Sequence, residues 1–153
     1  MNSEQSFRET IVSVDPGREK CGVAVVTSDL ELILKEIVSR DEAVGRVLEL
    51  TKKYGVHRVI LGDRTGSREF ASEIMEATGE LSACGCNRQD PRPELIFVDE
   101  HESSMEGRRR YLLNHPLRGI GRLLPISLRA PSEPFDDYVA VVLAERFFQC
   151  LKR

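Results

Sequence analysis

The stretch IVSVDPGREKCGVAVV, residues 11–26, places an acidic turn between two apolar runs. Asp15 ends the first run, and Pro16 and Gly17 stop that strand because both residues favour turns. The second run, residues 21–26, then carries the chain back as the other strand of a hairpin. A carboxylate at the tip of a strand, beside a tight turn, is well placed to bind a hard cation. An aspartate before Pro-Gly is also ordinary turn chemistry, so Asp15 alone leaves both interpretations open.

The rest of the chain alternates between runs of strand period and runs of helical period. Strands are expected at residues 11–14, 22–27, 32–38, 56–61 and 95–98, and helices at 41–53, 68–78, 103–114 and from about 135–137 onward. Residues 79–93 and 115–134 are rich in glycine, proline or both and are expected to be irregular. The order predicts a single α/β domain over residues 1–153. Its five-stranded mixed sheet has three antiparallel and then two parallel strands, flanked by helices.

The composition describes an ordinary globular protein, with 153 residues of which 41% are hydrophobic and 31% charged. No apolar run approaches the roughly 20 residues of a membrane span. Residues 1–10 lack the apolar stretch of a signal peptide. We therefore expect a cytoplasmic location, no membrane partner and reduced cysteines. Cys84 and Cys86 flank a glycine, but C-x-C without a second pair or a nearby histidine is poor spacing for zinc.

The net charge of −3 argues mildly against a nucleic-acid partner, but the charges are unevenly distributed. Between residues 101 and 131 the only acidic residues are Glu102 and Glu106, whereas arginine occurs six times. These arginines are Arg108, Arg109, Arg110, Arg118, Arg122 and Arg129. Such a cluster can bind phosphate on an acidic chain, although a solvated helix face followed by a loop explains it equally well.

Acidic residues also follow the strand at 95–98 and open the last helix. Asp99 and Glu100 are the first pair, and Asp136 and Asp137 are the second. The carboxyl ends of neighbouring strands meet at one edge of an open α/β sheet, so these acids can converge on Asp15. Clustered carboxylates repel one another unless a cation lies between them, and Mg²⁺ suits such a site. The alternative is that the first pair is exposed loop and the second pair caps a helix.

The set of motifs resembles the YqgF family, which belongs to the RuvC-like branch of the ribonuclease H-like fold. The matching segments are VDPGREKCGVAVV, VILGD with its glycine loop, FVDEHESS and DDYVAVVLAE, and together they span nearly the whole chain. The resemblance implies that Asp15, Glu100 and Asp137 are catalytic and bind the metal. Asp137 is preferred to Asp136 because the D-x-x-A spacing runs from Asp137 to Ala140.

The resemblance also implies an activity, that of a Mg²⁺-dependent nuclease with Mn²⁺ as a substitute. Members of the YqgF type imply maturation of ribosomal RNA precursors, which we take as the first expectation. Members of the RuvC type imply resolution of branched DNA and act as dimers on two-fold junctions, so a stable monomer would favour RNA. The expected partners are structured RNA or branched DNA, together with a weak homodimer. Candidate contacts to substrate phosphates are Arg18, Lys20, Arg64, Arg108, Arg109 and Arg110.

The chain departs from the family at several positions. The basic pair that usually follows the first glycine is Glu19-Lys20 here, the loop after Gly62 is short, and Ser103 and Ser104 replace two threonines. A nucleic-acid- or protein-binding module that keeps the fold without catalysis is therefore the main alternative. A phosphotransferase of the actin-like ATPase type would need a second lobe.

Overall fold

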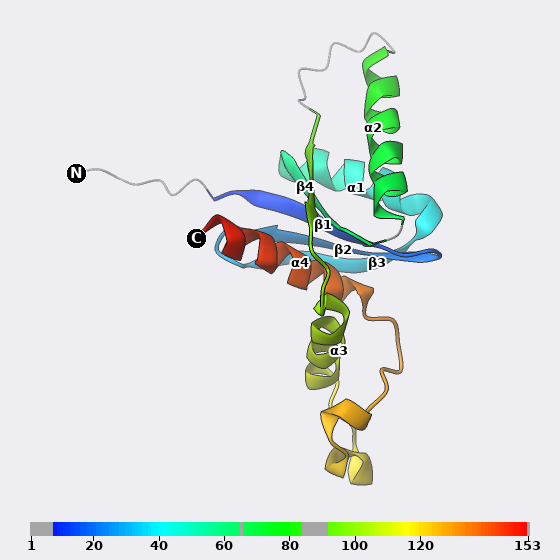
Figure 1. The fold of residues 1–153 in the computed structure, drawn as a ribbon, viewed down its shortest axis with the longest axis vertical. Coiled ribbons are helices and arrows are strands. Elements are labelled where there is room, and N and C mark those ends of the chain that lie inside the picture. The colour runs from blue at the N-terminus through cyan, green and yellow to red at the C-terminus, as the bar shows by residue number, and fades with distance from the viewer. Residues whose placement is uncertain (1–7, 65, 84–91, 153) are drawn as a thin grey trace, which may run out of the picture.

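The computed structural model describes residues 8–64, 66–83 and 92–152, apart from the side chains of residues 80–83 (Figure 1). The strands are β1 (Thr10–Pro16), β2 (Lys20–Thr27), β3 (Leu32–Ser39), β4 (Arg58–Gly62) and β5 (Glu94–Val98). The helices are α1 (Arg40–Tyr54), α2 (Ser67–Ala83), α3 (Ser103–Asn114) and α4 (Asp136–Leu151), with short 3₁₀ helices η1 (Gly119–Leu123) and η2 (Ile126–Leu128). The Cys84 and Cys86 pair lies outside the described residues.

The five strands form one sheet in the order β3-β2-β1-β4-β5. β1 pairs antiparallel with β2, which pairs antiparallel with β3, whereas β4 is parallel to both β1 and β5. This confirms the predicted mixed sheet. Because β1, β4 and β5 run in the same direction, their carboxyl ends reach the same edge, where the candidate site lies.

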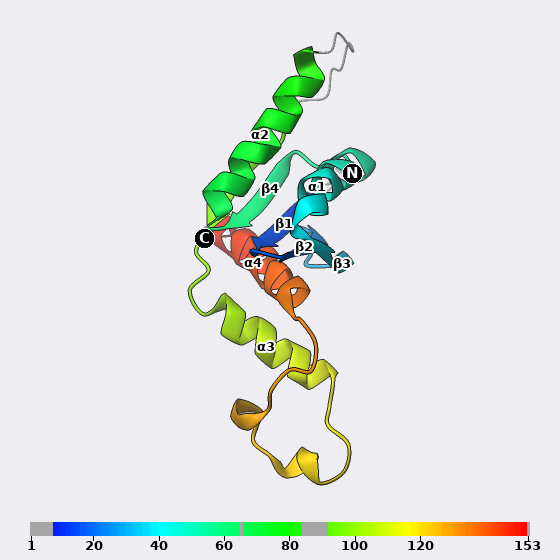
Figure 2. The ribbon, with the colours of Figure 1, turned by 90° about the vertical axis from the view of Figure 1, so that its right-hand side faces the viewer.

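Alternating residues of β1 face two different cores. Val12 and Val14 belong to a buried cluster that includes Phe70 of α2, with several residues of α1. Ile11 belongs to a second cluster on the opposite face, which includes Phe147 of α4. The sheet is therefore covered by α1 and α2 on one face and by α4 on the other, as Figures 1 and 2 show.

Helix α4 packs against the sheet on one side and against α3 on the other. At the second contact Gly107 lets the two helices approach closely, since a Cβ there would lie 2.7 Å from Cγ2 of Val139. Burial on two sides explains why the sequence of α4 is apolar around most of its circumference.

Two segments differ from the sequence prediction. Helix α2 continues to Ala83 instead of ending near residue 78, because the stretch after Gly79 consists mostly of good helix formers. Residues 115–134, which we call the arm, are not wholly irregular, since they contain η1 and η2. Figure 2 shows the arm projecting beyond α3, away from the sheet. Within the described ranges, no helix has the length and apolarity needed to cross a membrane.

Candidate active site

Asp15 lies near the end of β1 between two glycines on the neighbouring strands. On one side it is in register with Gly22 of β2. On the other side Val14 pairs with Leu61, so the next residue of β4 beside Asp15 is Gly62. Glycine inside a strand often marks a place where another part of the chain approaches closely. Both glycines do so here, and the groups that approach are acidic residues.

Glu100 follows β5 and turns its side chain into the space beside Gly62. Its Oε1 atom occupies the position that a Cβ on Gly62 would take. The Glu100 backbone is fixed from both directions, because its N–H donates to Oδ1 of Asp63 at 3.0 Å and its carbonyl accepts from Oγ of Ser103 at 2.7 Å. The side chain is only 2% exposed. A buried glutamate held in this way is part of the fold rather than an exposed loop residue.

The carboxyl groups of Asp15 and Glu100 perturb each other. Burial raises the pKa of Asp15 to about 6, and the negative charge of Asp136 adds to that rise. Burial and then the charge of Asp15 raise the pKa of Glu100 to about 7, while the positive charge of Arg64 opposes the rise. A proton on Glu100 allows the two carboxyl groups to share a hydrogen bond. The pair therefore resists carrying two negative charges at neutral pH.

Ionised Glu100 has too few partners for its oxygens. Nε of Arg64 lies 2.8 Å from Oε2 and forms an ion pair, with an arginine side chain that is 57% exposed. Neither carboxylate oxygen of Glu100 has a correctly aligned hydrogen-bond donor among the described residues. Buried polar atoms without a partner are rare in folded proteins and often mark a place for a ligand or ion.

The first turn of α4 brings two aspartates to the same edge of the sheet, and they face different neighbours. Gly22 allows this approach, since a Cβ there would overlap the backbone carbonyl of Asp136 and lie 2.7 Å from the N–H nitrogen of Asp137. Burial raises the pKa of Asp136, with the charge of Asp137 adding to it and that of Lys20 opposing it. Asp136 is thus the residue of α4 whose charge acts on Asp15.

Asp137 is instead held by β3. Its Oδ2 atom lies 2.6 Å from Nζ of Lys35, and its Oδ1 atom accepts the N–H of Tyr138 at 3.0 Å. The ammonium group also lies 4.0 Å from the centre of the Tyr138 ring. The hydrogen bond to Asp137 raises the pKa of Lys35 although burial opposes it. Of the three predicted acids, the structure brings Asp15 and Glu100 together and directs Asp137 to Lys35.

The unpartnered oxygens of Glu100, beside the carboxyl group of Asp15, fit a hard divalent cation, since oxygen atoms are the ligands that Mg²⁺ and Mn²⁺ prefer. Across residues 8–64, 66–83 and 92–152, no three His, Cys, Asp or Glu side chains form a complete metal-binding group. The sequence reasoning missed Asp63, which supports Glu100, and passed over Asp136. Asp63 could have been found from its position at the end of a buried strand, because Asp15 and Glu100 were singled out for the same kind of position.

The basic residues predicted to contact phosphate fall into two groups. Arg64 and Lys20 lie at the acids, since they act on Glu100 and Asp136. Arg18 is exposed and lines a cavity of about 580 Å³ between the turn after β1 and the first turns of α1 and α2. Of these three candidates, Arg64 and Lys20 lie beside the acids, whereas Arg18 lines a separate cavity, and their contacts to phosphate stay predictions.

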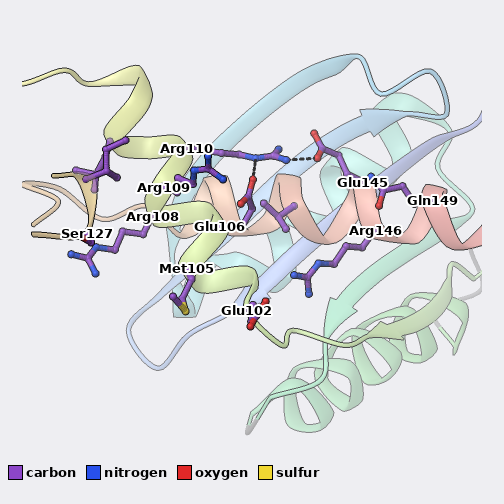
Figure 3. A pocket seen from close by; sticks show the side chains of 13 residues that line it. Glu102, Met105, Glu106, Arg108, Arg109, Arg110, Ser127, Glu145, Arg146 and Gln149 are labelled. Atoms are coloured by element: carbon purple, nitrogen blue, oxygen red, sulfur yellow. Dashed lines mark hydrogen bonds and ion pairs between the residues drawn. The ribbon is translucent and has the colours of Figure 1, made fainter. Parts of the chain in front are cut away.

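The α3 arginines lie on another surface, around a cavity of about 600 Å³ between α3 and α4 (Figure 3). Arg110 pairs with Glu106 at 2.9 Å and with Glu145 at 2.7 Å, and Arg108 donates to the carbonyl of Arg129 at 2.6 Å. The predicted phosphate contacts of Arg108 and Arg110 thus compete with existing partners. Arg109 is exposed and has no such partner within the described residues.

Comparisons with solved structures agree with this architecture. A structure of T. thermophilus RuvC in complex with a Holliday junction substrate is 17% identical, with a TM-score of 0.51, and the match covers 94% of this chain and 96% of that one. A structure of Fowlpox virus resolvase with substrate Holliday junction DNA is 14% identical, with a TM-score of 0.57, and the match covers 94% and 99%. No protein-family model and no curated protein matches the chain.

At these identities the similarity shows the fold, and that fold is the ribonuclease H-like mixed sheet expected from the sequence. The narrower resemblance to the YqgF family stays a prediction.

Proposed function

We propose that the protein is a divalent-cation-dependent nuclease that hydrolyses phosphodiester bonds in branched or structured nucleic acid. The observation that carries this proposal is the pairing of half-buried Asp15 with buried Glu100, whose pKa values are raised to about 6 and about 7. Such a pair is unfavourable when ionised and becomes favourable once a cation lies between the carboxylates. Mg²⁺ or Mn²⁺ suits the oxygen ligands.

Asp15 and Glu100 would hold the cation, with Asp136 contributing a third negative charge nearby. A bound divalent cation supplies a more acidic water and stabilises charge on the leaving oxygen. The remaining groups of the site position the substrate. Arg64 compensates the charge of Glu100 and has an exposed side chain that can reach a phosphate, and Lys20 provides a second positive charge beside Asp136.

A four-way DNA junction is the first substrate to test, because the two similar structures described above are complexes with Holliday junctions. The resemblance to the YqgF family favours a precursor ribosomal RNA as the second. A homodimer in solution would support the junction, since two cuts related by a two-fold axis need two sites.

A non-catalytic binding module is the second candidate function, and one observation favours it. Asp137, the acid that the family motif marks, forms an ion pair with Lys35. A site whose third acid, Asp136, acts only through its charge would bind a cation weakly and could serve nucleic-acid binding alone.

Cleavage assays separate these candidates. A labelled four-way DNA junction, a linear duplex of the same sequence and a structured precursor-rRNA fragment are incubated with Mg²⁺ or Mn²⁺. We expect cleavage of one branched or structured substrate by the wild type, and a loss of more than about 100-fold in Asp15→Asn and Glu100→Gln. Glu76→Gln, on the exposed face of α2, is the matched control.

Equal cleavage by wild type and Asp15→Asn, with both proteins folded by thermal unfolding, would refute the proposed site. Binding of these substrates without cleavage by any preparation would instead support the non-catalytic module.

A further inference from the structure

The arm, residues 115–134, exposes large apolar side chains to solvent. Ile120 is 86% exposed, Leu123 84% and Leu128 70%, and these residues lie in η1 and η2. Leu117 and Leu124 are also exposed. Ile126 of the arm packs against the buried cluster of Tyr111, Leu112 and Tyr138, whereas the more exposed side chains form a concentration of apolar groups on a projecting segment. Such a concentration marks an interaction surface. Figures 1 and 2 show that the arm projects from the end of α3 that is farther from the sheet.

Hydrogen bonds within the arm hold its shape. Arg129 donates through Nε to the carbonyl of Leu124 and through Nη2 to the carbonyl of Arg122, both at 2.8 Å. Arg108 of α3 in turn donates to the carbonyl of Arg129 at 2.6 Å, which ties the arm to the helix. The guanidinium groups of Arg129 and Arg108 therefore bind backbone carbonyls of the arm. These hydrogen bonds hold the backbone that carries the exposed apolar side chains.

The arm carries an excess of positive charge, with Arg118, Arg122 and Arg129 against a single acid, Glu133, near its end. No aspartate or glutamate occurs between Glu106 and Glu133. Arg118 and Arg122 are exposed, and within the described ranges their side chains make no ion pair or hydrogen bond. Arg118 lies two residues before Ile120, and Arg122 lies directly before Leu123. The surface therefore combines exposed apolar side chains with guanidinium groups that have no partner in the described ranges.

The arm is connected to the candidate active site through the length of α3 at its first end and through the start of α4 at its second end. Helix α3 begins three residues after Glu100, and the chain returns from the arm directly into Asp136 at the start of α4. A helix of the length of α3, Ser103–Asn114, spans about 18 Å. That distance corresponds to about five base pairs of duplex at 3.4 Å per pair. One substrate can thus reach the acids and the arm together.

We propose that the arm is a branch-binding wedge: Ile120 and Leu123 contact unpaired or unstacked bases at a DNA junction, while Arg118 and Arg122 bind the adjacent phosphates. This inference rests on the proposed function and deepens it. Apolar side chains that insert at a disrupted base step, flanked by arginines on the backbone, are a recurring way to bind deformed DNA. Charge complementarity selects this occupant, because the arm carries free cations and DNA carries a negative charge on every phosphate.

A second copy of the chain is the competing occupant of the same surface. Two arms facing each other would bring three arginines from each copy together against one glutamate, Glu133, which opposes that arrangement. The experiment below includes it as an outcome.

The test measures equilibrium binding in EDTA, where cleavage does not interfere. Fluorescence anisotropy compares a four-way DNA junction with a linear duplex of the same sequence, using the full chain. Ile120→Ser/Leu123→Ser is the wedge variant and Arg118→Gln/Arg122→Gln is the charge variant. Leu32→Ser/Ile33→Ser on β3 is the apolar control, since its side chains are 43% and 41% exposed. Lys52→Gln/Lys53→Gln at the end of α1 is the charge control.

The wedge variant is expected to bind the junction about tenfold more weakly and the linear duplex nearly as well as the wild type. The charge variant is expected to weaken both and to reduce the slope of log K against log salt by about 2. The two controls should bind like the wild type.

Three results would overturn the inference. If both arm variants bind the junction within twofold of the wild type while Asp15→Asn still abolishes cleavage, the arm is not the wedge and the proposed function stands. If the wild type binds neither DNA, the inference and the proposed DNA substrate both fail. If light scattering shows that the wedge variant turns a dimer into a monomer at unchanged junction affinity, the arm joins two copies instead.

Discussion

Oε1 of Glu100 fills the position beside β4 that a Cβ on Gly62 would occupy. Gly62 is therefore a structural requirement for the site, because a side chain there would expel the carboxylate from its place beside Asp15. On the other side of Asp15, the lack of a side chain at Gly22 leaves space for the backbone of Asp136. The two glycines explain how acids distant in sequence meet at one strand end.

Gly62→Ala is the first prediction. The new methyl group overlaps the Glu100 carboxylate, which is buried and has little space to move, so we expect a loss of about 1–3 kcal/mol in the free energy of unfolding. Urea denaturation measures it. In the double variant Gly62→Ala/Glu100→Ala the overlap disappears, and much of the loss should be recovered.

Gly45→Ala in α1 is the matched control, since no atom lies within 4 Å of its Cβ. It should be neutral or stabilising by up to about 1 kcal/mol, as expected for alanine in a helix. A Gly62→Ala protein as stable as Gly45→Ala would contradict the described packing of Glu100.

The second prediction separates the two aspartates of α4. Asp136→Asn should lose nuclease activity and keep or gain stability, because burial and like charges raise the pKa of Asp136. Asp137→Asn should retain activity and lose about 1–3 kcal/mol, because it weakens the half-buried ion pair with Lys35. Initial cleavage rates and urea denaturation of both variants are the measurements. The reverse pattern would show that Asp137 is the third acid.

The third prediction concerns pH in the absence of metal. The pKa values of Asp15 and Glu100, about 6 and about 7, exceed those of an unfolded chain, so the folded state binds more protons between about pH 4 and pH 7. The stability contribution of this pair is then complete below about pH 4 and is lost as the pH rises through 6 to 7. In EDTA, the melting temperature of the wild type should fall relative to that of Asp15→Asn/Glu100→Gln between pH 5 and pH 7.5. Parallel melting curves for the two proteins would contradict the coupling.

The sequence was sufficient for the fold because its periodic patterns agree with its turns. The apolar run at residues 11–14, the Pro16-Gly17 break and the short apolar runs at 56–61 and 95–98 are each consistent with strands and a turn, and the sheet is the one predicted. The end of α2 was less certain, since Gly79 resembles a stop signal although the residues after it favour a helix.

The site was harder to predict because it depends on directions that a sequence pattern does not contain. Successive residues of a helix point about 100° apart, so only one of Asp136 and Asp137 can face Asp15. A spacing motif selected Asp137, but Lys35, far away in sequence on β3, binds it. Arg110 was likewise predicted to contact phosphate, but its guanidinium group forms an ion pair with Glu145 of α4, which is distant in sequence.

Divalent-cation binding tests the central claim most directly. Isothermal titration of Mn²⁺ into the wild type, Asp15→Asn, Glu100→Gln and the control Glu76→Gln measures whether the carboxylate pair is the site. We expect one binding event in the wild type and in Glu76→Gln, weakened at least tenfold in each of the other two variants. Mn²⁺ binding of equal affinity in wild type and Asp15→Asn would contradict the claim that Asp15 and Glu100 hold the metal.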